Sequence, residues 1–265
     1  MVAPIGLDID VEAMSQLAND KVIYASVVGS HQYGWNDETS DIDVHGCYIS
    51  PLMTVLSLEH SDVVISRKFD GEIEVNLFEL EKELKLILDN NCNVYEHLSS
   101  PYRLITSPLH LELMVLAKRA LSKKIINSYM GLATHNYKKY IEPFIHKEPA
   151  SIPAKKFLYV MRALMSGIYV LNKGHIESNI YKLNRYHNFD VIDKLIEVKK
   201  SKYGTNGLNY KKLDEIIQEL FIELKTAEKE SPVIPDTIDN SVYEHVNRFM
   251  YRTRLLEANH YEFTR

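Results

Sequence analysis

The sequence predicts an α+β protein, in which a small mixed β-sheet with flanking helices is followed by an all-helical C-terminal part. Two observations lead to this fold class. Short β-branched or alternating runs fill the first hundred residues, whereas apolar residues recur at helical spacing from residue 79 onward. The chain has 265 residues, of which 45% are hydrophobic, enough for one large or two modest domains. We expect a sheet domain at residues 1–106 and a helical domain at residues 107–265.

The predicted sheet contains at least four strands. Runs rich in β-branched or alternating residues place them at residues 22–28, 44–49, 62–68 and 72–78, after a short helix at residues 11–19. Asp70 and Gly71 form a hairpin turn signal between the last two strands. A further short strand at residues 102–106 could belong to the same sheet.

The helical pattern begins where the alternation ends. Leu80, Leu84 and Ile87 share one face of an amphipathic helix that ends near residue 90, and Ser107 before Pro108 is typical of a helix start. That helix should run to about residue 119. Further helices are expected near residues 123–145, 153–173, 190–201, 209–228 and 241–259.

Composition excludes several classes of protein. No apolar run approaches the roughly 20 residues of a membrane span, and the first residues lack the basic and apolar regions of a signal peptide. Cys47 and Cys92 are too few for a disulfide framework and lie in no zinc-binding spacing. We therefore expect a cytoplasmic protein without a membrane partner.

The charge is distributed unevenly along the chain. Residues 1–100 carry 5 Lys+Arg and 18 Asp+Glu, whereas residues 101–265 carry 26 and 18. A metal-carboxylate site and a phosphate-binding surface would produce such an asymmetry, and so would two charge-complementary domains with solvated faces. Residues 118–156 alone carry nine Lys+Arg against two Glu. This cluster could follow an RNA backbone or form a solvated helix face.

One stretch, residues 29–46, carries the candidate chemistry. Gly29 and Ser30 end an apolar strand, and a glycine turn exposes backbone N–H groups to an anion, although the same pair also marks a simple tight turn. Asp41 and Asp43 share one strand face about 6.6 Å apart, a spacing that suits divalent ions but also occurs in loops. For a third carboxylate we favour Glu74 over Glu72, because Glu72 adjoins the turn.

These residues fit a known family. The segments GSHQYGWNDETSDIDVHGCYISP and FELEKELKLILDNNCNVYEHL resemble the DNA polymerase β-like nucleotidyltransferase superfamily, and more narrowly its RNA-ligase-associated members. The narrower pattern is G-S-x-x-Y-G, S-D-x-D-x-x-G-x-Y and N-x-N-x-x-E. The close match covers residues 26–98, and two departures are Cys92, where proline is usual, and Tyr159, where histidine is common.

The resemblance implies a role for each matching position. Gly29 and Ser30 would hold the β- and γ-phosphates, Asp41 and Asp43 would bind two Mg²⁺ or Mn²⁺ ions, and Glu74 would bind one of them. Glu74 would also orient or deprotonate the acceptor hydroxyl. In-line attack on the α-phosphorus needs charge neutralised on the entering and leaving oxygens, which two ions roughly 3.5–4 Å apart supply.

Other candidate residues lie outside the carboxylates. Lys155, Tyr159 and Arg162 share a helical face that could grip a nucleotide, or Tyr159 could be core with the cations as its rim. The motif tyrosine, Tyr33, completes the nucleotide-binding set. Possible supporting residues, which would brace the strands of the site, are Asn91, Asn93 and Glu96. The alternative is that this stretch only ends one helix and begins a short one.

The sequence therefore predicts a metal-dependent nucleotidyltransferase of RNA repair. It would transfer a nucleoside monophosphate from a nucleoside triphosphate such as ATP to a hydroxyl acceptor, with RNA as a candidate acceptor, and release pyrophosphate. The alternative is a catalytically inactive nucleotide- or RNA-binding accessory protein of RNA ligation or repair. A phosphodiesterase that uses the same carboxylates is a third hypothesis.

Overall fold

The structure, a computed structural model, describes residues 11–17, 21–58, 63–69, 73–145, 147, 152–201 and 208–262. The chain folds into two compact units. The sheet unit comprises Met1–Gln32, Ser40–Leu121 and Ile238–Arg265. The helical unit comprises Tyr33–Thr39 and Ser122–Thr237. Each unit is described by itself.

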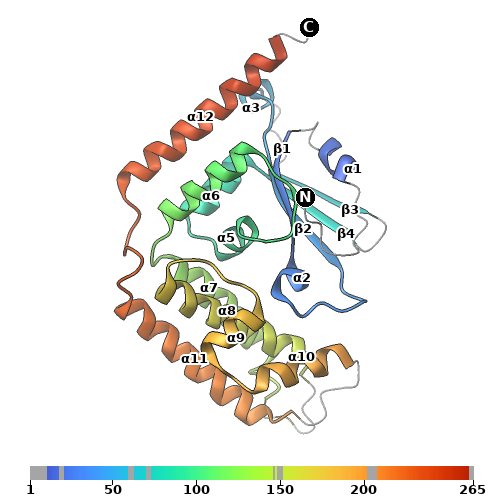
Figure 1. The fold of residues 1–265 in the computed structure, drawn as a ribbon, viewed down its shortest axis with the longest axis vertical. Coiled ribbons are helices and arrows are strands. Elements are labelled where there is room, and N and C mark those ends of the chain that lie inside the picture. Colours follow the sequence, from blue (N-terminus) through green and yellow to red (C-terminus); the bar gives the residue numbers. More distant parts are fainter. Residues whose placement is uncertain are drawn as a thin grey trace. The chain divides into compact units, whose positions relative to one another are not determined.

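The sheet unit contains a mixed five-stranded sheet, which confirms the predicted fold class (Figure 1). Its strands are β1 (Val22–Val28), β2 (Ile42–Tyr48), β3 (Val64–Phe69), β4 (Ile73–Glu79) and β5 (Arg103–Ile105). The spatial order is β3-β4-β2-β1-β5, with β2 and β4 parallel and the other neighbours antiparallel. The short strand expected at residues 102–106 is therefore β5, at one edge of this sheet.

Helices cover both faces of the sheet. The helices of this unit are α1 (Val11–Gln16), α3 (Leu52–Leu56), α4 (Leu80–Leu88), α5 (Cys92–Leu98), α6 (Pro108–Ala120) and α12 (Asn240–Glu262), and α2 (Gly29–Tyr33) begins in it. Met14 of α1 packs with Val44 and Val75 on one face. The opposite face, which carries Tyr24 and His45, contacts α4, α5 and α6.

Local sequence explains where the helices start. The Ser107 hydroxyl accepts a hydrogen bond from the His110 backbone N–H, as its N-cap position predicts. Glu79 ends β4 and caps α4, because its carboxylate accepts from the Glu81 N–H at 2.7 Å. Asn90, at the end of α4, adopts a φ of +54°, a conformation that asparagine tolerates better than most residues.

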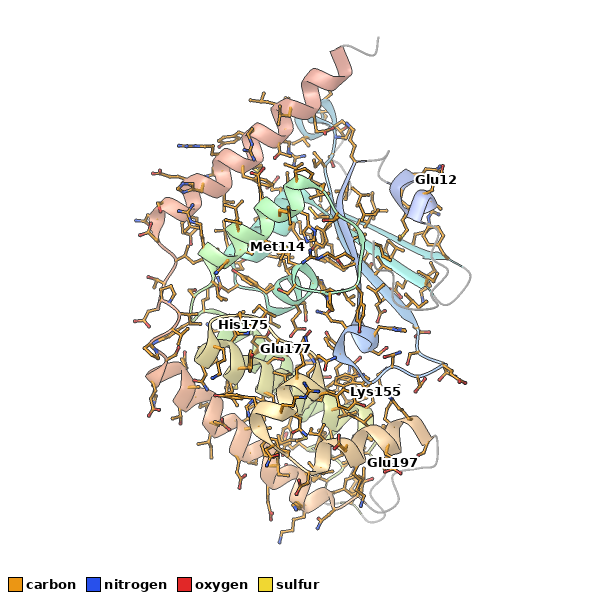
Figure 2. The ribbon with its side chains drawn as sticks, in the orientation of Figure 1. Glu12, Met114, Lys155, His175, Glu177 and Glu197 are labelled. Carbon is orange, nitrogen blue, oxygen red and sulfur yellow. The ribbon has the colours of Figure 1, made fainter. Side chains whose placement is uncertain are left out.

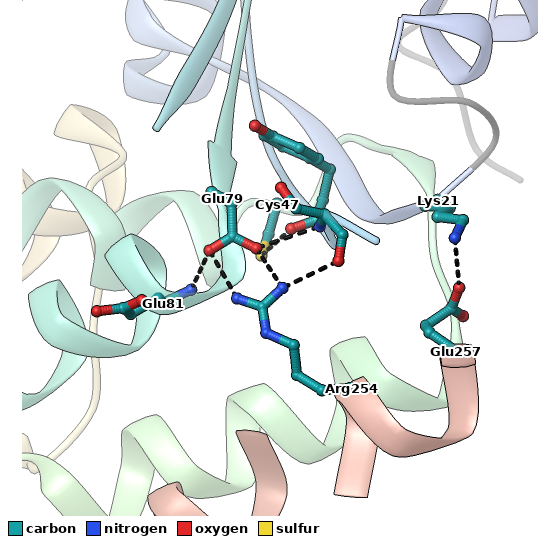
Figure 3. A network of polar contacts seen from close by, with 8 residues as sticks. Lys21, Cys47, Glu79, Glu81, Arg254 and Glu257 are labelled. Atoms are coloured by element: carbon teal, nitrogen blue, oxygen red, sulfur yellow. Dashed lines mark hydrogen bonds and ion pairs between the residues drawn. The ribbon is translucent and has the colours of Figure 1, made fainter. Parts of the chain in front are cut away.

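A buried arginine fixes the C-terminal helix to the sheet unit (Figure 3). Arg254 of α12 forms a 2.8 Å ion pair with Glu79 and donates a 3.1 Å hydrogen bond to the Ser50 carbonyl. The Lys21 and Glu257 side chains form a second ion pair, at 3.1 Å. A sequence pattern does not reveal these contacts, because their partners are far apart in the chain.

The helical unit is built around one apolar helix. It contains α7 (Ile125–Tyr140), α8 (Ala154–Lys173), α9 (Ile180–His187), α10 (Val191–Ser201) and α11 (Tyr210–Glu230). α8 contacts each of the other four and buries most of its residues, and Gly174 ends it at a φ of +72°. The sequence did not predict α9, which is short and buries only Ile180 and Leu183.

The compact units do not follow the expected border between residues 106 and 107. Both α6 and α12 belong to the sheet unit. α6 contacts β1, α4 and α5, and α12 contacts α3, α4 and α6. Both helices are amphipathic, so sequence periodicity alone does not tell which core they join. Among the described helices, none is long and apolar enough to cross a membrane.

Candidate functional site

The motif begins with a glycine whose backbone conformation and close contacts disfavour any larger residue. β1 ends at Val28, and Gly29 has a φ of +62° at the start of α2 rather than in a simple turn. A Cβ atom built on Gly29 would lie 2.1 Å from the Oδ2 atom of Asp43. The backbone of the motif therefore packs directly against one of the predicted metal-binding carboxylates. Ser30 follows it and is buried.

The three predicted carboxylates occupy neighbouring positions at one end of the sheet. Asp43 pairs with Val28 of β1 and with Glu74 of β4, so the Asp43 and Glu74 side chains emerge on the same face. Asp41 directly precedes β2 and is exposed. We call Asp41, Asp43 and Glu74 the carboxylate row. The alternative, Glu72, lies outside the described residues.

Two neighbours hold the Glu74 carboxylate. Asn76 donates a 3.2 Å hydrogen bond to its Oε1 atom, and the Lys68 ammonium of β3 lies 3.5 Å from Oε2. The Asn76 hydrogen bond, followed by Lys68, lowers the pKa of Glu74. The row therefore contains an ionised carboxylate that is open to solvent.

The row has the donor chemistry that a divalent cation needs, and the strand register brings its carboxylates to neighbouring positions. Carboxylates from neighbouring strands are the ligands that Mg²⁺ and Mn²⁺ prefer. The side chains themselves are not gathered: within the part of the chain that the structure describes, no three His, Cys, Asp or Glu side chains come together to hold an ion. The Lys68 ammonium instead provides the positive charge beside Glu74.

A buried polar cluster lies on the same face of the sheet, behind the carboxylate row. Tyr24 donates a 2.6 Å hydrogen bond to Glu83 of α4, and the His45 Nε2 atom lies 3.4 Å from the other Glu83 oxygen. The His97 ring lies tilted against His45, with centroids 4.1 Å apart, and the His110 ring stacks on Tyr24 at 4.5 Å. We call these five side chains the buried cluster.

Burial determines the charge of this cluster. It raises the pKa of Glu83 to about 8, and burial together with the Lys82 charge lowers the pKa of His45 to about 3. The proton therefore resides on Glu83, and its contact with His45 joins two neutral groups rather than an ion pair. Sequence reasoning missed Glu83, although it lies one residue before Leu84 on the apolar face of α4.

The three predicted supporting residues lie in or beside α5. The Asn91 side chain caps α5 by accepting from the backbone N–H groups of Asn93 and Val94, at 3.1 and 3.3 Å. Asn93 is exposed. Glu96 is fully buried, and its carbonyl accepts a 2.7 Å hydrogen bond from the Gln32 side chain of α2. Through this contact, α5 holds the helix that follows Gly29.

The predicted nucleotide-binding residues outside the sheet unit come together in the helical unit. The Arg162 guanidinium lies 3.8 Å above the Tyr33 ring, and the Tyr33 and Tyr159 centroids are 6.2 Å apart. Lys155 lies 5.7 Å from the Tyr159 ring and is exposed (Figure 2). Arg162 is only 1% exposed, so its face is largely core rather than open surface.

Sequence reasoning also missed Trp35, the one tryptophan of the chain. Trp35 is fully buried, and its ring lies edge-on to Tyr159 at 5.3 Å. Asp37 and Lys199 form an ion pair at 2.5 Å, and this contact holds the pKa of Asp37 well below its usual range. The segment Tyr33–Thr39 is thus anchored within the helical unit, to which it belongs.

Comparison with known proteins gives the family. Residues 7–252 match the RNA repair pathway DNA polymerase beta family, which is most of the chain. The chain belongs to this family. The match confirms the relationship that residues 26–98 indicated, and it extends through the helical part. It supports a polymerase β-like nucleotidyltransferase at the level of the superfamily.

The matching proteins do not assign an activity. An uncharacterized protein of Methanocaldococcus jannaschii is 27% identical over 220 residues, or 81% of this chain and 87% of that protein. An uncharacterized protein of Bacillus subtilis is 25% identical over 170 residues, or 63% of each chain. A nucleotidyltransferase-like crystal structure from Exiguobacterium sibiricum covers 82% of this chain and 71% of its own, at 11% identity and a TM-score of 0.31.

Proposed function

We propose that the protein is a metal-dependent nucleotidyltransferase, which moves a nucleoside monophosphate from a nucleoside triphosphate to a hydroxyl acceptor. The carrying observation is the packing of Gly29 against Asp43, with Glu74 opposite Asp43 in the neighbouring strand. This arrangement puts a backbone able to approach phosphate beside carboxylates able to hold its counter-ions. Family membership supports the proposal at the level of the superfamily.

Each residue of the row has a role in this proposal. Asp41, Asp43 and Glu74 would hold two Mg²⁺ or Mn²⁺ ions, which when bound neutralise charge on the entering and leaving oxygens. Glu74 is ionised and would accept the proton of the attacking hydroxyl. A bond forms between the acceptor oxygen and the α-phosphorus, and the bond from that phosphorus to pyrophosphate breaks.

The remaining predicted residues would bind the nucleotide. Gly29 and Ser30 would contact the phosphates through backbone N–H groups and the serine hydroxyl. In the proposed set of Tyr33, Lys155, Tyr159 and Arg162, Lys155 is the cation open to solvent. The buried Arg162 would act indirectly, by fixing the ring of Tyr33.

A transfer assay tests the proposal. The protein is incubated with α-labelled ATP, Mg²⁺ and a mixture of RNA acceptors, as wild type and as the double variant Asp41→Ala plus Asp43→Ala. We expect label on the acceptor for the wild type and none for the variant. The matched control, Asp193→Ala plus Glu197→Ala on α10, removes two carboxylates elsewhere and should transfer normally. Labelling that survives loss of Asp41 and Asp43 would sink the proposal.

One observation favours a second candidate, a nucleotide- or RNA-binding accessory protein without turnover. No three potential ligands gather around an ion in the described residues, and Lys68 lies beside Glu74 instead. Calorimetric titration with ATP, with and without Mg²⁺, separates the two. The enzyme requires metal-dependent binding that weakens in the double variant, whereas the accessory protein binds equally well without metal. Nucleotide loss without transfer would instead indicate the phosphodiesterase.

A further inference from the structure

Five lysines gather where α7 ends and α8 begins in the helical unit. Lys138 and Lys139 lie in the last turn of α7, Lys147 follows that helix, and Lys155 and Lys156 lie in the first turn of α8. Lys138, Lys139, Lys147 and Lys155 are exposed, and Lys156 is half-buried. Together with Tyr140 and Phe144 they form what we call the lysine-aromatic surface.

The two rings of this surface hold three of the five lysines in place. The Lys156 ammonium lies 3.6 Å above the Tyr140 ring, and that of Lys139 lies 5.0 Å from it. Lys147 lies 4.8 Å from the Phe144 ring, which is 42% exposed. Cation–π contacts of this kind orient the charges without neutralising them. The surface therefore combines fixed cations with aromatic rings that are still accessible.

Carboxylates do not neutralise these cations within the part of the chain that the structure describes. There, none of the five lysines forms an ion pair. Elsewhere in the same unit the pattern differs, because Lys123, Lys182 and Lys199 each pair with an acidic residue. The described carboxylate closest in sequence is the exposed Glu142.

The position of two of these lysines is also unfavourable for the isolated helix. Lys155 and Lys156 lie at the positive end of the α8 dipole, where acidic residues are preferred. A bound polyanion would relieve both this repulsion and the repulsion among the lysines. A single phosphate could not contact cations spread over two helices and the segment between them.

We propose that the lysine-aromatic surface binds a single-stranded polynucleotide. Lysines would contact successive phosphates, and the exposed Phe144 ring would stack on a base, a combination typical of sequence-independent single-strand binding. An acidic protein segment would use the cations but not the rings. This binding goes beyond the proposed transfer reaction.

Fluorescence anisotropy with a labelled, unstructured 20-nucleotide RNA tests the surface. The wild type is compared with Lys139→Gln plus Lys156→Gln, and with Lys211→Gln plus Lys225→Gln, which removes two exposed lysines of α11. At 0.1 M salt we expect the first variant to lose about tenfold or more in affinity and the control less than about threefold. The dependence of log K on log salt should flatten by about 1.4 in the first variant, since each lost phosphate contact contributes about 0.7.

A second pair of variants tests the rings. Phe144→Ala should weaken binding about fivefold or more without changing the salt dependence, and Phe144→Trp should keep wild-type affinity, because stacking is worth ~1–3 kcal/mol per base. Equal losses in the lysine variant and its α11 control would overturn the proposal. Competition by polyglutamate as strong as by RNA would also overturn it, as would an unchanged affinity of Phe144→Ala.

Variants of the carboxylate row separate RNA binding from nucleotide transfer. RNA binding should be intact in Asp41→Ala plus Asp43→Ala, because the lysine-aromatic surface contains neither residue. Conversely, the lysine double variant should still release pyrophosphate with a dinucleotide acceptor. A protein that binds RNA but never transfers nucleotide would refute the proposed function alone, and a transferase without single-strand affinity would refute this surface alone.

Discussion

Two carboxylates on the same side of one sheet, Glu74 and Glu83, have opposite charge states. Glu74 belongs to the exposed carboxylate row, where an amide and an ammonium lower its pKa. Glu83 belongs to the buried cluster, where burial raises its pKa to about 8. The residue type is the same, and access to water differs. An ionised, exposed carboxylate can bind a cation, whereas a protonated, buried one can only hold its neighbours in place.

The two regions should therefore fail in different ways when their glutamates are removed. Glu74→Ala should lower nucleotide transfer about 10³-fold, since it would remove a metal ligand and the proton acceptor, and should leave the melting temperature unchanged. Glu83→Ala should lower the free energy of unfolding by ~3 kcal/mol, because it leaves a cavity and strips Tyr24 and His45 of a partner. Transfer rates and denaturant melts measure both.

The conservative variants sharpen this contrast. Glu83→Gln keeps an amide that can accept from Tyr24 and should recover most of the stability, whereas Glu74→Gln should not recover transfer. A Glu83→Ala protein that is as stable as the wild type would contradict the assignment of Glu83 to the core. Equal loss of transfer in correctly folded Glu74 and Glu83 variants would remove the distinction between the two regions.

The buried cluster should make stability fall with pH in a defined window. Glu83 has a folded pKa of about 8, above its ordinary 4.5, so the folded state keeps a proton that the unfolded state releases. His45, with a folded pKa of about 3 against an ordinary 6.5, has the opposite effect, but only below pH 6.5. Between pH 6.5 and 8 the Glu83 effect exceeds that of His45 and of His110, whose pKa burial lowers to about 4. The free energy of unfolding should fall there by ~2 kcal/mol.

Urea melts at half-unit steps of pH measure this change. Glu83→Gln provides the control, because it has no proton to lose and its stability should be nearly flat over the same window. A wild-type stability that rises from pH 6.5 to 8 would show that the proton is not on Glu83.

The strand positions of the exposed row follow from local sequence far more directly than the contacts of the buried cluster. Asp41 and Asp43 are neighbours in the chain, so their shared face follows from strand geometry, and Glu74 follows from the alternation of β4. The contact between Glu83 and Tyr24 joins residues 59 positions apart. No local pattern contains it, because only the packing of α4 on the sheet brings the two together.

The difference between local patterns and long-range contacts also explains why the sequence did not reveal α9 and the burial of Trp35. α9 spans only eight residues, about two turns, which is too short for a sequence window to separate it from its flanking loops, and it is held by Ile180 and Leu183 packed in the helical unit. Trp35 lies in a polar segment, and its burial depends on Tyr159, which is more than a hundred residues away. Local patterns predicted the strands and the long helices of this chain, and tertiary contacts determined which side chains are withdrawn from water.

A smaller effect is expected where the exposed row meets the glycine motif. Gly29→Ala should lower the free energy of unfolding by ~1–2 kcal/mol, because alanine disfavours a φ of +62° and its Cβ would displace Asp43. Transfer should fall as well. The control is Gly131→Ala in α7, where a Cβ meets nothing within 4 Å and alanine should stabilise the helix. A Gly29→Ala protein with normal stability would show that the turn can relax.

The smallest effect concerns Lys68, the cation beside Glu74. Because its ammonium lies 3.5 Å from the Glu74 carboxylate and would compete with a cation for it, Lys68→Gln should lower the Mn²⁺ concentration for half-maximal binding about twofold. Lys85 forms a matched pair with Glu81 on α4, with side chains 70% and 47% exposed against 71% and 41% for Lys68 and Glu74. Lys85→Gln should leave Mn²⁺ binding unchanged, as followed by the paramagnetic resonance of free Mn²⁺. Weaker binding in Lys68→Gln would mean that Lys68 supports Glu74 as a ligand rather than competing with the ion.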